Sequence, residues 1–296
     1  MRALAEFIMR GRMQATLVVV IAAFLPLLYW LSAAAGSLIV LRRGAGDAAG
    51  VVVWALLPAV LWWWLGDPSL LLVFLGTLAL ASALRSSVSW PRVLLASVLV
   101  GSVFALVLGH VYAEPINLLA EEIRKILPQM IGQSPDALPE AKQAQLKQML
   151  VPVLTGLMAS FFQITCLLSL MLGRHWQAAL YNPGGFAREF HALRLPPVMA
   201  FGVLLVMLLA PNISIELGML TPLCSVPLAV AGVALAHGLV KRKHMSGFWL
   251  VGLYVTLLVF GQLIYPLLVI MAVVDSLFDF RGRLADTPKD SANGEG

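Results

Sequence analysis

Apolar blocks long enough to cross a lipid bilayer recur along the chain, and they constrain its fold more than any other feature. A transmembrane helix needs about 20 consecutive apolar residues. Blocks of this kind occupy residues 16–41, 47–65, 69–84, 91–112, 149–172, 196–211, 218–239 and 247–278, and the charged residues lie almost wholly between them. Because backbone groups in lipid must be satisfied within the protein, the blocks predict helices. We therefore expect an all-α fold, a polytopic integral membrane helix bundle of about eight or nine transmembrane helices.

The composition excludes several other classes of protein. The chain is 60% hydrophobic and only 12% charged, whereas soluble domains carry about 25% charged residues. The net charge of +5 does not indicate nucleic acid as a partner, because the basic residues are scattered in short loops beside the apolar blocks, where they encode topology. The expected organisation is one helical transmembrane domain over residues 1–280 and a polar, disordered tail over residues 281–296.

The first block allows two topologies. It contains Pro26, so it crosses the bilayer either once, tilted, or twice as a hairpin broken at the proline. With one crossing, the 20 Lys and Arg residues divide equally between the two sides; with two crossings, thirteen of them share one face. The hairpin obeys the positive-inside rule and places the amino terminus in the cytoplasm of a bacterial cell, with the protein in the inner or cytoplasmic membrane. The last block contains Pro266, which leaves the side of the tail open.

The longest polar segment, residues 113–147, predicts a helix that lies on the membrane surface. Its first half carries apolar residues at helical spacing, with charged residues on the other side. The apolar positions are Ile116, Leu119, Ile123, Ile126 and Met130, and the charged ones are Glu121, Glu122, Arg124 and Lys125. A docking surface for a protein partner is the alternative interpretation.

A second polar segment, residues 174–197, combines turn chemistry with charge. Asn182, Pro183, Gly184 and Gly185 form a strong turn signal. Residues 186–195 then predict a short amphipathic helix whose Arg188, Glu189 and Arg194 face water or lipid head groups. A connecting loop with an interfacial helix is the simplest interpretation. We also expect that Asn182, Glu189 and Arg194 form functional or architectural contacts with Asp275, Asp279 and Arg281 at one cytoplasmic end of the bundle.

Two further sets of residues lie within the apolar blocks. Small side chains repeat every four residues along one helical stripe and predict close packing against another helix; they are Ser97, Gly101, Ala105 and Gly109. Polar residues at membrane depth are costly and tend to face a bundle interior or a cavity; the candidates are His110, Gln163, His237 and Gln262. A hydrogen bond across helices is the ordinary role of such a residue, and a ligand cavity requires several of them to converge.

The sequence contains no Walker A loop, GxSxG elbow, HExxH or CxxC motif. Cys166 and Cys224 both fall inside apolar blocks, where a thiol usually behaves as a small hydrophobe. The histidines show no spacing typical of a metal site. We therefore expect no catalytic residues, no cofactor and no metal, and we expect that the protein is not an enzyme.

Three runs of sequence resemble a known family. They are LYNPGGFAREFHALRLP (180–196), VAGVALAHGLVKRK (230–243) and VVDSLFDFRGRL (273–284), and the LRRG run at 41–44 is similar as well. Together they resemble the YybS-like family of bacterial membrane proteins, which is distantly similar to the substrate-binding S components of energy-coupling-factor transporters. The resemblance implies a small-molecule ligand bound within the membrane.

The sequence therefore favours a non-enzymatic small-molecule-binding or transport-related subunit. The alternative is a membrane scaffold that binds protein partners through the 113–147 and 174–197 segments. The partners expected are the lipid bilayer and either a small-molecule ligand or other proteins.

Overall fold

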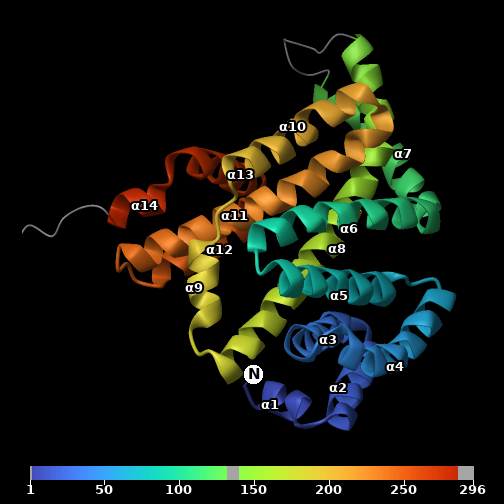
Figure 1. Cartoon of the computed structure of the whole chain (residues 1–296). Coiled ribbons are helices and arrows are strands. Elements are labelled where there is room, and N and C mark those ends of the chain that lie inside the picture. Colours follow the sequence, from blue (N-terminus) through green and yellow to red (C-terminus); the bar gives the residue numbers. More distant parts are fainter. Residues whose placement is uncertain (1, 132–139, 286–296) are drawn as a thin grey trace, which may run out of the picture. The chain divides into compact units, whose positions relative to one another are not determined.

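The computed structural model describes residues 2–131 and 140–285, and every regular element in these ranges is a helix (Figure 1). The predicted all-α class is confirmed. The chain divides into two compact units. Unit 1 comprises residues 1–186 and 202–227, and unit 2 comprises residues 187–201 and 228–296.

The elements fall into three groups by unit. Those of unit 1 are α1 (Arg2–Arg10), α2 (Arg12–Phe24), η1 (Pro26–Leu28), α3 (Tyr29–Arg43), α4 (Ala45–Trp64), α5 (Ser69–Ser87), α6 (Trp90–Val111), α7 (Ala113–Ile131), α8 (Glu140–Tyr181) and η2 (Ile215–Met219). Those with residues in both units are α9 (Gly185–Ala192), α10 (Pro197–Ile213) and α11 (Leu220–Arg242). Those of unit 2 are α12 (Phe248–Val259), α13 (Gly261–Phe278) and α14 (Phe280–Ala285).

The first apolar block breaks at Pro26 and forms the antiparallel helices α2 and α3, neither of which is among the segments long and apolar enough to cross a membrane. Ser32 Oγ donates to the Val19 carbonyl at 2.9 Å, and Arg43 Nη2 donates to the Met9 carbonyl at 3.0 Å. From Ser32 to Arg43 the residue numbers rise, while those of their partners fall from Val19 to Met9, so the two segments run antiparallel. The chain therefore reverses between α2 and α3, and Arg43 returns to the end of unit 1 where the chain begins.

Helix α3 forms the core of unit 1. It packs against α1, α2, α4, α5 and α8 (Figure 1), and every residue from 32 to 41 is buried. Gly36 and Gly173 allow close approach: a Cβ at Gly36 would lie 3.0 Å from the Phe74 ring, and one at Gly173 would contact Ser37 Oγ of α3. A helix that is buried on all sides must be small and apolar around its whole circumference, and the Ala-rich sequence of α3 meets this requirement.

Six helical segments in the described ranges are long and apolar enough to cross a membrane, or seven if the bent pair α9 and α10 forms one span. The six are α4, α5, α6, α8, α13 and Ile215–Arg242, which joins η2 to α11. The predicted count of eight or nine is not confirmed. Helix α2 has 13 residues and α12 has 12, so at about 1.5 Å per residue each falls short of a hydrocarbon core of about 30 Å.

Helix α7 occupies the first half of the predicted surface segment. Its Ile116 and Ala120 are buried, whereas Leu119 and Ile126 are half exposed. Two short ion pairs lie along it, Glu121 to Arg124 at 2.5 Å and Glu122 to Lys125 at 2.7 Å. The helix and its amphipathic character are as predicted, but only part of the apolar face contacts the protein; the side chain of Met130 lies outside the described part.

Helix α8 is a single helix of 42 residues, longer than the predicted block 149–172. At about 1.5 Å per residue it measures roughly 63 Å. The predicted loop at 174–197 therefore begins too early: Arg174 to Tyr181 continue the helix, and Trp176 is fully buried. The predicted turn follows at once, with Gly184 at φ +78°, and then the short helix α9.

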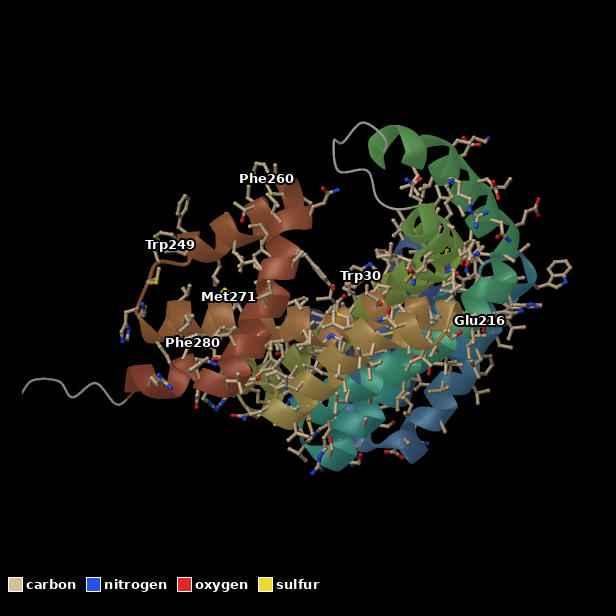
Figure 2. All side chains as sticks on the ribbon, turned by 90° about the horizontal axis from the view of Figure 1, so that it is seen from above. Trp30, Glu216, Trp249, Phe260, Met271 and Phe280 are labelled. Atoms are coloured by element: carbon tan, nitrogen blue, oxygen red, sulfur yellow. The ribbon has the colours of Figure 1, made fainter. Side chains whose placement is uncertain are left out.

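The last apolar block forms two helices rather than one. Figure 2 shows α12 and α13 as the arms of a V, with Phe260 at the tip and Trp249 and Phe280 toward the open end. Arg242, just before α12, donates to the Arg281 carbonyl just after α13, so both arms begin and end at the same end of unit 2. Pro266 lies inside α13 without breaking it, and the chain reverses at Phe260 instead.

Candidate functional site

A buried ion pair lies at the carboxyl end of α13. Arg281 Nη2 contacts Asp275 Oδ2 at 2.7 Å, and the two side chains are only 4% and 3% exposed. The other carboxylate oxygen, Oδ1, accepts from the Phe280 amide at 3.1 Å. The helix ends at Asp279, whose φ of +46° turns the chain back and brings Arg281 onto Asp275.

Arg281 also donates hydrogen bonds to the segment that joins α9 to α10, which we call the α9–α10 linker. Its Nη1 donates to the His191 carbonyl at 2.9 Å and to the Leu193 carbonyl at 2.8 Å. His191 lies in the last turn of α9 and Leu193 directly follows the helix, so no helical amide remains to bond their carbonyls. Gly238 of α11 leaves room for this contact, since a Cβ there would lie 2.7 Å from the His191 carbonyl oxygen and 2.9 Å from Arg281 Cδ.

Arg194 caps the same end of α13 from the linker. Its Nε donates to the Asp275 carbonyl at 3.1 Å and its Nη2 to the Ser276 carbonyl at 2.8 Å. Its Nη1 pairs with Asp279 Oδ2 at 2.9 Å. A cation at a helix carboxyl terminus satisfies unpaired carbonyls and favours the negative end of the helix dipole. Arg194 therefore points into the protein, rather than toward water as predicted.

We call Arg194, Asp275, Asp279 and Arg281 the arginine–aspartate cluster. The structure brings together these four of the predicted contact residues. Glu189 lies on α9 in the same unit, half buried, and Asn182 lies in unit 1. Arg281 had been assigned to a disordered tail, but residues 281–285 are helical and Arg281 is buried; the rest of that tail, from 286 onward, lies outside the described residues.

The turn residues before α9 act locally. Asn182 accepts at its carbonyl from the Gly185 amide at 2.9 Å, which closes the turn over Pro183 and Gly184. A Cβ at Gly185 would lie 2.5 Å from the Asn182 side-chain amide, so this position fits glycine. These contacts set the direction in which the chain leaves α8.

The arginine–aspartate cluster has the chemistry of a structural contact rather than of a binding site. Both oxygens of Asp275 and both terminal nitrogens of Arg281 are bonded to protein groups. An ion pair that is buried and bonded on all sides has little capacity to bind a ligand as well. The cluster therefore joins the end of α9 and the linker after it to α11 and α13 within unit 2.

A second polar site lies within unit 1, at Gln163 of α8. This side chain is fully buried, and its Nε2 donates to Ser97 Oγ of α6 at 2.9 Å. Its Oε1 has no hydrogen-bond partner in the described structure. This oxygen lies over Gly101, where a Cβ would be only 3.0 Å away.

Thr77 of α5 lies beside Cys166 of α8, and its Oγ1 is buried. It lies one turn after Val73, whose carbonyl is 3.5 Å from Cys166 Sγ, and Cys166 is itself one turn after Gln163. The described part of the chain also leaves Ser169 Oγ and Trp176 Nε1 of α8 buried without a partner. We call Thr77, Ser97 and Gln163 the intramembrane polar site.

The stripe of small residues on α6 lies against this site. Ser97, Gly101 and Ala105 are buried, and a Cβ at Gly101 would also lie 2.7 Å from Leu223 of α11. Near the end of the stripe, a Cβ at Gly109 would lie 3.3 Å from the Thr155 side chain of α8. Small side chains thus allow α6 to approach α8 closely at the level of Gln163.

The other predicted intramembrane polar residues do not join Gln163. His110 and Gln262 are exposed. His237 lies in unit 2, where its Nε2 is 3.3 Å from the Tyr254 hydroxyl and its ring stacks on His191 at 6.5 Å. The sequence analysis missed Thr77, Ser169 and Trp176. One buried face of α8 could have been recognised from residues that recur every three to four positions: Gln163, Cys166, Ser169, Gly173 and Trp176.

The helices are compatible with a multi-pass membrane protein, by their length and apolar composition. No protein-family model, curated protein or solved structure matches the chain.

Proposed function

We propose that the protein is a non-enzymatic membrane protein that binds a small polar molecule at the intramembrane polar site, as a binding or transport-related subunit. The observation that supports this most is the unpartnered Oε1 of buried Gln163. A buried polar atom without a partner costs about 1–3 kcal/mol, and in native proteins such atoms usually bond to water, an ion or a ligand. The resemblance to the YybS-like family, which is distantly similar to S components, implies a small-molecule ligand within the membrane.

Replacing Gln163 with Met tests this function. Met has a similar volume and no amide, so the variant should fold with nearly unchanged stability. A matched control is Thr165→Val on the same helix, because the Thr165 hydroxyl bonds only its own helix, at Phe161. Mass spectrometry of the gently solubilised protein should detect a bound small molecule on the parent and on Thr165→Val, and should not detect it on Gln163→Met. Equal occupancy of the three proteins, or no small molecule on the parent, would refute the proposal.

A scaffold role is the second candidate, and the exposed face of α7 favours it. Leu118 is 62% exposed and Ile126 is 51% exposed beside the Glu122–Lys125 pair. An apolar stripe flanked by charges suits a partner helix as well as a membrane surface. Stable co-purification of a soluble protein that is lost on Leu118→Ser, with the Gln163 variants behaving as the parent, would favour this candidate.

We further propose that the basic end of unit 1 faces the cytoplasm of a bacterial cell, with the amino terminus on that side. Thirteen of the 20 Lys and Arg residues support this orientation. The α12–α13 hairpin places Arg281 and Arg283 at the end of unit 2 that carries Arg242.

Cysteine labelling in intact cells tests the orientation. Ser86, at the end of α5, and Glu121, on α7, are both exposed and separated by the length of α6. A cysteine at Ser86 should resist a membrane-impermeant thiol reagent, and a cysteine at Glu121 should react with it. The native Cys166 and Cys224 are buried and give the background. The opposite labelling pattern would invert the topology.

A further inference from the structure

An open groove of about 610 Å³ runs between α2 and α4 of unit 1. The two helices are parallel and joined at both ends. At one end Arg12 Nη2 pairs with Asp47 Oδ1 at 3.0 Å, and at the other Trp62 Nε1 donates to the Ala23 carbonyl at 3.2 Å. Between these contacts the helices leave the groove, whose volume lies in the range of small-molecule sites, about 300–1,000 Å³.

The walls of the groove are apolar along most of its length. Met13, Leu17 and Ile21 line it from α2 at intervals of four residues, and Trp54 lines it from α4. All four are exposed, by 77%, 49%, 53% and 58% respectively. Gly50 forms part of the α4 wall, and a Cβ at this position would meet nothing within 4 Å. The absence of a side chain at Gly50 therefore keeps the groove open.

One end of the groove carries a cation. Arg12 lines it, and its side chain is 72% exposed although it pairs with Asp47. A guanidinium has five N–H donors, and Asp47 accepts through one nitrogen of Arg12. The exposed Arg10 precedes it by two residues. A long apolar groove with an arginine at one end fits an amphiphile that has an anionic head group and an extended apolar chain.

We propose that this groove holds an acyl chain of an anionic phospholipid, with the lipid phosphate at Arg12. Arg12 begins the apolar helix α2, where the polypeptide enters the hydrocarbon. The lipid phosphate would therefore lie at the arginine while the acyl chain extends along the groove. Anionic head groups attract arginines near the membrane surface. The acyl chain fills the space over Gly50, and it covers the exposed face of Met13, Leu17 and Ile21.

Native mass spectrometry of the detergent-solubilised full chain tests this site, with phosphatidylglycerol and phosphatidylcholine of identical acyl chains as probes. The parent should bind phosphatidylglycerol more tightly. Gly50→Leu should fill the groove and reduce the binding of both lipids, whereas Gly252→Leu, at a second helical glycine with nothing within 4 Å of its Cβ position, should not. Arg12→Gln should lower the preference for phosphatidylglycerol by about fivefold, and Asp47→Asn should raise it.

Two results would overturn the proposal. Equal lipid binding by Gly50→Leu and Gly252→Leu would show that the groove is not the site of the acyl chain. A change of oligomeric state in Gly50→Leu, with lipid binding retained, would show that a second copy of the chain occupies the groove instead. Melting curves for both glycine variants establish whether they are folded, which is expected because neither Cβ position has an atom within 4 Å.

Discussion

Replacing Asp275 with Asn should destabilise the protein by about 3–5 kcal/mol, because it leaves the Arg281 guanidinium buried without its counter-charge. Asparagine keeps the size of the side chain, so the loss reports charge rather than volume. Asp279→Asn is the matched control: this carboxylate is 44% exposed in its pair with Arg194, and an exposed pair contributes about 1 kcal/mol or less. Unfolding in mixed detergent micelles, followed by tryptophan fluorescence, measures both.

A double-mutant cycle separates the pair from its surroundings. Arg281→Met alone should also be destabilising, since the carbonyls of His191 and Leu193 lose their donor. Combined with Asp275→Asn, it removes both charges, and the loss should be smaller than the sum of the two single losses. If the losses instead add, or if Asp275→Asn is as mild as Asp279→Asn, the two side chains do not form a buried ion pair.

The second large effect is expected at the crossing of α3 and α8. A single methyl group added by Gly173→Ala would contact Ser37 Oγ and lie 2.8 Å from the Ala34 carbonyl oxygen. Relief requires a shift of the α3 backbone, so the variant should lose about 1–3 kcal/mol or more. Gly252→Ala, where nothing lies within 4 Å, should instead gain about 0.4–1 kcal/mol from the reduced freedom of the unfolded chain.

Adding Ser37→Ala to the Gly173→Ala variant shows which contact matters. It removes the hydroxyl but not the Ala34 carbonyl, so it should restore only part of the lost stability. Full recovery would mean that the hydroxyl alone is responsible, and equal stability of Gly173→Ala and Gly252→Ala would mean that the two helices do not cross as closely as described. The same unfolding assay serves for both.

The features that were predictable from sequence are the local ones. The break at Pro26 and the turn at residues 182–185 follow from backbone preferences of proline, glycine and asparagine, which need no distant partner. The helical spacing on α7 was likewise visible in a short window of sequence. Of the intramembrane polar site, Ser97 and Gln163 were identified because polar residues in apolar blocks are conspicuous.

The remaining features depend on contacts between distant residues. Arg281 looks like a solvated residue of a polar tail until the αL turn at Asp279 brings it onto Asp275. Arg174 and Gln177 gave residues 174–181 the composition of a loop, but Gln177 donates to the Leu41 carbonyl and Trp176 is buried, so the helix continues. Thr77 was missed because a threonine in an apolar helix usually bonds its own backbone, and only the fold shows that it does not.

The arginine–aspartate cluster joins residues that are synthesised at different times. Arg194 donates to the carbonyls of Asp275 and Ser276, which lie 81 and 82 residues later in the chain. The His191 carbonyl accepts from Arg281, which lies 90 residues later. At translation rates of about 5–20 residues per second, the linker is therefore synthesised roughly 4–18 s before its partners. A chain that terminates before Asp275 contains all of unit 1 but lacks the residues that close unit 2. Arg194 and the His191 carbonyl therefore gain these partners only after residues 275–281 have been synthesised, so the arginine–aspartate cluster forms late in the synthesis of unit 2.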